Sequence, residues 1–335
     1  MPLSPEAEAV PSQIPASAGQ VAPNAAGARM LGKSYRELLR QELIRAIEHA
    51  EVGLEVEVPL LRERIESLDA SKRFSPALFA GFSRLADAFR DEKSEAVLDA
   101  LQWLCTLSKK EILDARFRFG SILEERWEDP FIAEIRKPPT DRHSDGDTEL
   151  QALLETDLSV VDAVYSDALR LIEEADEDMH AEISQYVTRF KLFQGGGVAA
   201  VSSPRVFGAV FLRLPSDSTP LGPYLIEHMV HETSHLALNA LMAHDPLLQN
   251  PHEIHAAPIR PDPRPLYQVL HGTFVLARNQ RVLERLAQDR PEEFPLGQSF
   301  ERSAEAYARG LETLEEYAVW TEAGSALFET FDPPG

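Results

Sequence analysis

The sequence contains an H-E-x-x-H pattern, with His231 and His235 at its ends and Glu232 beside the first histidine. Four residues span just over one turn of an α-helix, so in a helix both imidazoles lean to the same side and can bind one metal ion. Glu232 then points about a quarter turn away, where it can act on a bound water or orient a neighbour. The pattern predicts a metal centre; two ordinary histidines on a half-buried helix are the alternative.

The stretch from Pro223 to His244 predicts the helix that carries this pattern. No glycine or proline interrupts it after Pro223, and His228 lies one turn before His231, where we interpret it as a packing neighbour rather than a ligand. The apolar residues recur at helical spacing: Leu225, Ile226, Met229, Val230, Leu236, Ala237, Ala240 and Leu241.

Two histidines do not complete a catalytic metal site, because zinc hydrolases and non-haem iron oxygenases commonly use three protein ligands. His271 is the favoured third ligand, since it lies early on a helix predicted from Leu266 and the adjacent Gly272 would let a second helix approach closely. Residues 245–265 contain six prolines, which predict an irregular segment that holds ligands less firmly. The other candidates lie in this segment or near the C-terminus: His252, Glu253, His255 and Glu305.

The fold predicted around this helix is mainly α, of the α+β class, with a small β-sheet beside a zincin-like HExxH helix. Residues 1–32 are predicted to be a disordered tail, 33–148 a helical N-terminal region, and 149–335 the metal-binding catalytic region. The expected helices begin at Ser34, with a capping box to Glu37, and at Pro76 after Ser75. Further helices are expected over residues 94–126, 150–193 and 299–329, strands over 198–201 and 206–212, and a turn at Gly195–Gly197.

The composition is that of a globular protein, with 335 residues, 44% of them hydrophobic, and a formal net charge of -22. Such acidity would repel phosphate backbones, so no nucleic-acid partner is expected. Cys105 is the one cysteine, which excludes a disulfide within the chain and fits a small core residue in a reducing cytoplasm. With no secretory signal and no stretch long enough to span a bilayer, the expected location is cytoplasmic and no membrane partner is expected.

Three blocks together resemble the 2-oxoglutarate-dependent HExxH-type peptide β-hydroxylases. The blocks are SSPRVFGAVFLRL at 202–214, then LIEHMVHETSHLALNALM, then IRPDPRPLYQVLHGTFVLAR at 259–278. These enzymes accompany bacterial clusters for ribosomally made, post-translationally modified peptides (RiPPs). The resemblance covers roughly residues 200–280 and leaves the N-terminal half unmatched. It implies an iron centre held by His231, His235 and His271, with 2-oxoglutarate as co-substrate and a precursor peptide as substrate.

The residues are compatible with that chemistry. Three protein ligands on Fe(II) leave two positions for 2-oxoglutarate and one for O₂. The distal carboxylate of 2-oxoglutarate needs a cation, which a guanidinium can supply in a bidentate contact. Arg264 in the D-P-R-P turn, Arg278 two helical turns after His271 and Arg260 are the candidates, and for each a surface or structural ion pair is the alternative. A three-histidine set departs from the usual pair of histidines with one carboxylate.

Two other functions remain open. In a zinc metallopeptidase the same three histidines would serve and Glu232 would be the general base on a zinc-bound water. The longer metallopeptidase pattern H-E-x-x-H-x-x-G-x-x-H is not present, because Leu241 stands where its last histidine would be. The chain could instead be a peptide-binding scaffold with a vestigial metal site, and in either case an extended peptide could add to the edge of the predicted sheet.

Overall fold

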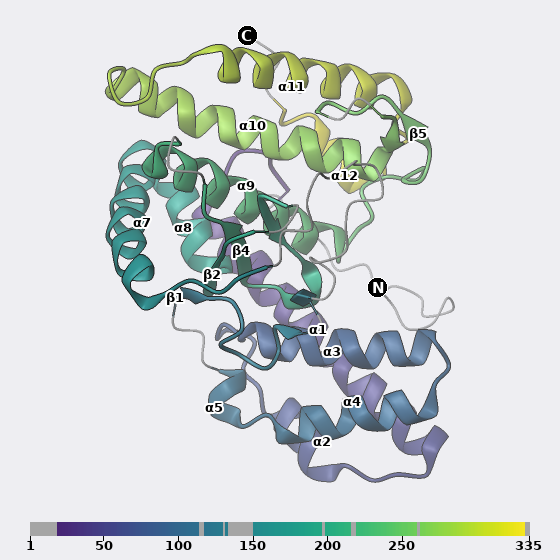
Figure 1. Cartoon of the computed structure of the whole chain (residues 1–335). Coiled ribbons are helices and arrows are strands. Elements are labelled where there is room, and N and C mark those ends of the chain that lie inside the picture. Colours follow the sequence, from purple (N-terminus) through teal and green to yellow (C-terminus); the bar gives the residue numbers. More distant parts are fainter. Residues whose placement is uncertain are drawn as a thin grey trace. The chain divides into compact units, whose positions relative to one another are not determined.

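The computed structural model describes residues 19–113, 117–129, 131–132, 150–195, 198–215, 219–259 and 262–331. The chain is mainly α-helical with a small mixed β-sheet, as the sequence predicts (Figure 1). It folds as two compact units that interleave along the sequence. Unit 1 consists of the described residues of Gly32–Leu158 and Val187–Leu214, and unit 2 of those of Pro11–Leu31, Ser159–Tyr186 and Pro215–Gly335. The predicted boundary between residues 148 and 149 lies outside the described residues.

The first helix starts earlier than predicted. Helix α1 spans Ala25–Leu54, so Ser34 lies inside it and is not its N-cap. Asn24 is the residue that caps it, because the Gly27 N–H donates to the Asn24 side-chain oxygen at 2.7 Å. The predicted tail of residues 1–32 therefore extends too far; residues 1–18 of it lie outside the described part of the chain.

The other helices of unit 1 are α2 (Pro59–Glu66), α3 (Pro76–Arg90), α4 (Ser94–Thr106) and α5 (Lys109–Ile112). Helix α3 begins as predicted, with a proline in its first turn. The Cys105 side chain is exposed, so its predicted place in the core is wrong. Leu101 and Leu104 face the core from α4 instead, and Cys105 lies on the other side of its last turn.

The sheet of unit 1 contains β1 (Arg118–Ser121), β2 (Arg189–Phe193), β3 (Ala200–Ser202) and β4 (Ala209–Arg213), in the order β1-β2-β4-β3. β1, β2 and β4 are parallel, and β3 is antiparallel to β4. β3 and β4 overlap the two predicted strands, and a short 3₁₀ helix, η1 (Pro204–Val206), separates them. β1 and β2 fall where helix was predicted, and that prediction is wrong.

β2 is buried along its whole length although it carries two basic residues. Its Lys191 ammonium lies 2.9 Å from Glu124, 3.2 Å from Glu125 and 2.9 Å from Glu128. The Arg189 guanidinium lies 2.9 Å from Glu125. Burial of these cations is tolerated because carboxylates from the turn after β1 surround them.

Unit 2 is built from helices, with α7 (Glu155–Ala175), α8 (Glu177–Tyr186), α9 (Leu221–Met242), α10 (Leu266–Asp289), α11 (Gln298–Tyr317) and α12 (Glu322–Phe328). α10 packs against α9 on one side and α11 on the other, and α8 also packs against α9 (Figure 1). Between α9 and α10 the proline-rich segment is irregular, as predicted, apart from the short paired strands β5 (Ile254–His255) and β6 (Arg264–Pro265). Within the described part of the chain, every helix is too short or too polar to cross a membrane.

Candidate functional site

The structure brings together the three histidines that the sequence singles out. α9 carries His231 and His235 one turn apart, and their ring centroids are 4.9 Å apart. The His271 ring on α10 lies 5.3 Å from the His235 ring, and the two Nδ1 atoms are 3.1 Å apart, within hydrogen-bond distance. We call these three residues the histidine cluster. Its members come from the two helices that pack against each other in unit 2.

Burial keeps the histidine cluster neutral. All three rings are only partly exposed to solvent. Burial lowers the pKa of His231 and of His271 to about 4, and the neighbouring His228 contributes to the shift at His231. Burial and the two other imidazoles hold the pKa of His235 well below its ordinary value. At pH 7 each ring is therefore uncharged, which is the form in which imidazole binds metal ions.

The donor geometry fits a shared metal ion in part. Two nitrogens bound to one ion at about 2.0–2.1 Å lie roughly 3 to 3.4 Å apart for bond angles between octahedral and tetrahedral. The 3.1 Å between Nδ1 of His235 and Nδ1 of His271 falls in this range. As the side chains stand, however, no group of three or more His, Cys, Asp and Glu residues in the described part of the chain could hold one ion. A complete three-histidine site therefore requires rotation of at least one ring.

The segment around Pro258 packs closely against α10 next to His271. A Cβ on Gly272 would stand 3.0 Å from the Pro258 ring, so the close neighbour of Gly272 is the proline-rich segment and not the second helix that was predicted. The close approach of a second helix occurs at Gly310 of α11, where a Cβ would collide with the Thr273 hydroxyl. Both contacts lie within two residues of His271 along α10.

Glu232 is buried on α9, with 3% of its surface exposed. Its side chain interacts with other groups of the chain. His228, the further histidine on this helix, lies against the Tyr224 ring at 4.1 Å, and its Nδ1 is 2.9 Å from the Tyr224 carbonyl oxygen. These contacts agree with its interpretation as a packing residue.

The other candidate ligands make contacts elsewhere. His255 stacks on the Tyr317 ring with centroids 4.1 Å apart, and its Nε2 is 3.5 Å from a Glu253 oxygen. His252 meets the edge of the Tyr267 ring at 6.0 Å. Glu305 has 72% of its side chain exposed and lies 4.0 Å from Arg309. None of these contacts involves a member of the histidine cluster.

The three candidate arginines differ in their surroundings. Arg264 lies on β6 just before α10, is partly exposed, and forms an ion pair with Asp262 at 2.5 Å. Arg278 is buried and donates to Glu182 at 2.6 Å and to the Val21 carbonyl at 2.7 Å. Its guanidinium therefore makes the structural ion pair that the sequence left as the alternative. Arg260 lies outside the described residues.

Comparison with protein-family models and with curated proteins finds no match. The relation to the peptide β-hydroxylases therefore remains the resemblance drawn from the three sequence blocks.

Proposed function

We propose that the chain is an Fe(II)- and 2-oxoglutarate-dependent oxygenase that hydroxylates a β-carbon in a ribosomally made precursor peptide. Its iron would be held by His231, His235 and His271. One observation carries the proposal: α10 brings His271 to within 3.1 Å of His235, a residue 36 positions earlier in the chain. A three-imidazole donor set supports a redox-active or Lewis-acidic metal, and the resemblance favours iron.

When bound, Fe(II) would supply the one-electron chemistry that activates O₂ while 2-oxoglutarate is oxidised to succinate and CO₂. The chain's own residues would bind and orient the reactants. The neutral imidazoles would donate lone pairs without first losing a proton. Arg264 is our candidate for the distal carboxylate of 2-oxoglutarate, because it is partly exposed and stands seven residues before His271 on the segment that leads into α10. We leave Arg278 out of this role because its guanidinium already binds Glu182 and the Val21 carbonyl.

A zinc metallopeptidase is the second candidate function. The observation that favours it is the presence of the whole H-E-x-x-H pattern within one helix, α9, as in zincins. The same histidines would then hold zinc, and Glu232 would accept the proton of a zinc-bound water. A peptide-binding scaffold without catalysis is the third, and it requires that the histidine cluster bind no metal.

The first experiment tests the metal and the co-substrate. Full-length protein reconstituted with Fe(II) without oxygen should develop a weak visible charge-transfer band when 2-oxoglutarate is added. His271→Ala should abolish the band, and the matched variant His255→Ala should keep it because the His255 ring stacks on Tyr317 instead. Stoichiometric iron binding by His271→Ala would show that His271 is not the third ligand and would contradict the proposal.

The second experiment separates the oxygenase from the peptidase. The chain is co-expressed with a candidate precursor peptide, and the peptide mass is measured. A gain of one oxygen atom supports the oxygenase, whereas cleavage fragments support the peptidase. Glu232→Gln should abolish cleavage because it removes the general base, and a hydroxylase should lose less activity. A cytoplasmic location, with the peptide as partner and neither nucleic acid nor membrane, belongs to the same proposal.

A further inference from the structure

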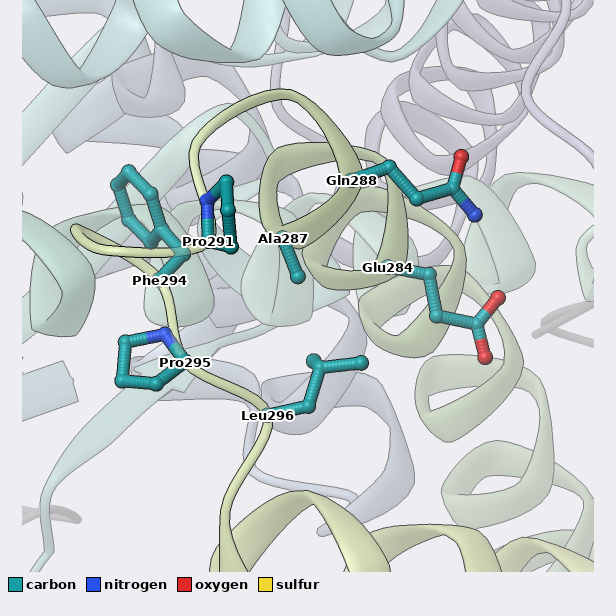
Figure 2. A pocket seen from close by; sticks show the side chains of 7 residues that line it. All are labelled: Glu284, Ala287, Gln288, Pro291, Phe294, Pro295 and Leu296. Carbon is teal, nitrogen blue, oxygen red and sulfur yellow. The ribbon is translucent and has the colours of Figure 1, made fainter.

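A recess lies on α10, well away from the histidine cluster. It has a volume of about 480 Å³, which is within the range of small-ligand pockets. It is formed by the last turns of α10 and the loop that leads to α11 (Figure 2). Ala287 lies at its centre, Glu284 and Gln288 stand together on one side, and prolines and Phe294 stand on the other (Figure 2).

The recess has two chemically distinct walls. Pro291, Pro295 and Leu296 form an apolar wall, and 48% of Leu296 is exposed. The opposite side is lined by Glu284 and Gln288, whose carboxylate and amide lie at its outer edge (Figure 2). Phe294 is buried and lines the recess on the same side as the prolines. A ligand that matches both walls would have an apolar side chain next to a cationic one.

The charge on Glu284 is available to such a ligand. Among the described residues, no basic side chain forms an ion pair with it. Its basic neighbours on α10 are directed elsewhere, since Arg281 and Arg285 both pair with Asp176, at 2.7 Å and 2.8 Å. The loop beyond α10 also carries the exposed Glu292 and Glu293, which do not line the recess, and Glu293 pairs with Arg290 at 3.4 Å. An anionic ligand would be repelled here and a cationic one attracted.

We propose that this recess binds a segment of the peptide substrate in which an apolar residue lies within about four residues of a lysine or arginine. The proposal rests on the proposed peptide modification. Glu284 lies 13 residues after His271 on the same helix, which places it about 20 Å along α10. Roughly six extended residues span that distance. The docking segment would therefore be separate from the modified residue, and α10 would set the spacing between them.

The first test selects binders from a phage library of random twelve-residue peptides on the full-length chain. Selected sequences should combine an apolar residue with lysine or arginine and should fail to bind the double variant Glu284→Lys/Leu296→Asp. Selection of acidic sequences, or of sequences that bind the double variant equally well, overturns the proposal. Failure to select any peptide that depends on these two positions overturns it as well.

The second test measures the affinity of the best selected peptide by fluorescence anisotropy. Glu284→Lys should weaken binding at least tenfold. The matched variant Glu292→Lys makes the same change of net charge outside the recess and should change affinity less than twofold. Equal weakening by both variants would mean attraction to the acidic surface in general. Self-association of the chain that Leu296→Asp abolishes would make the recess an interface between copies. Either result overturns the proposal.

These measurements use binding alone and need neither metal nor co-substrate. A failed selection leaves the charge-transfer band of the histidine cluster unaffected. A missing band likewise leaves peptide docking intact. The two proposals therefore fail in different experiments.

Discussion

Replacing Arg278 by methionine distinguishes a structural arginine from a co-substrate ligand. The Arg278 and Glu182 side chains are 3% and 5% exposed, and 2.6 Å separates their nearest charged atoms. Methionine keeps most of the side-chain length and removes the charge, so Glu182 would remain buried without its cation. Breaking a buried ion pair in this way costs about 3–5 kcal/mol. The lost hydrogen bond to the Val21 carbonyl falls within that figure rather than adding to it.

The assay is urea unfolding of full-length protein followed by circular dichroism. Arg278→Met should lower the free energy of unfolding by about 3–5 kcal/mol. Arg281→Met is the matched control on the same helix. Arg281 is 32% exposed, and its partner Asp176 keeps a second cation in Arg285, so the loss should be roughly 1 kcal/mol or less.

A double variant tests the cause of the loss. Glu182→Met combined with Arg278→Met leaves no buried charge at this place. The double variant should therefore lose about 1–3 kcal/mol less in free energy of unfolding than the two single variants lose together. An Arg278→Met protein within 1 kcal/mol of the parent that has lost 2-oxoglutarate binding would refute this reasoning. It would return Arg278 to the co-substrate role that the sequence suggested.

Three further predictions concern stability. Burial depresses the pKa of the histidine cluster, to about 4 for two of its members, so the unfolded chain binds more protons below the ordinary histidine pKa. Metal-free protein should therefore lose stability as the pH falls from about 6.5 to about 4 and stay level above, with a flatter profile in His271→Gln; urea unfolding across this range checks it. Lys191→Met should cost about 3–5 kcal/mol, because it leaves the fully buried Glu128 without its cation, whereas the exposed Lys110→Met should be neutral by the same assay. Gly310→Ala should cost about 1–3 kcal/mol through overlap with the Thr273 hydroxyl, while Gly53→Ala, with no atom within 4 Å of the new Cβ, should stabilise the chain slightly; melting temperatures would show both.

The elements that were predicted correctly are those whose determinants lie close together in the sequence. Ser75 and Pro76 mark the start of α3 within two residues, and the prolines after α9 end that helix and delay the next until Leu266. The apolar spacing of α9 fixes the direction of its two histidines without help from the rest of the chain. Such features can be recognised in a window of a few turns.

The elements that were missed depend on partners far away in the sequence. β2 reads as RFKLF, and two cations in five residues do not suggest a buried strand. It is buried because Glu124, Glu125 and Glu128 approach it from more than 60 positions earlier. The start of α1 has the same origin, since the Asn24 and Ala25 N–H groups donate to Glu182 and Asp178 of α8. No local pattern contains that information.

The candidate site likewise has one part that is determined locally and one part that depends on distant residues. α9 specifies a pair of imidazoles locally, but a pair is compatible with packing, with zinc or with iron. The position of the third imidazole depends on tertiary contacts of α10 on either side of it. Pro258 packs against Gly272, and Gly310 of α11 packs against Thr273, both next to His271. The middle of α10 is buried on nearly all sides, and Arg278, Asn279 and Gln280 are all covered, so small shifts of this part of the helix meet resistance from several neighbours. The position of His271, and with it the capacity of the cluster for a third ligand, is therefore a property of the packing around α10 rather than of the H-E-x-x-H pattern.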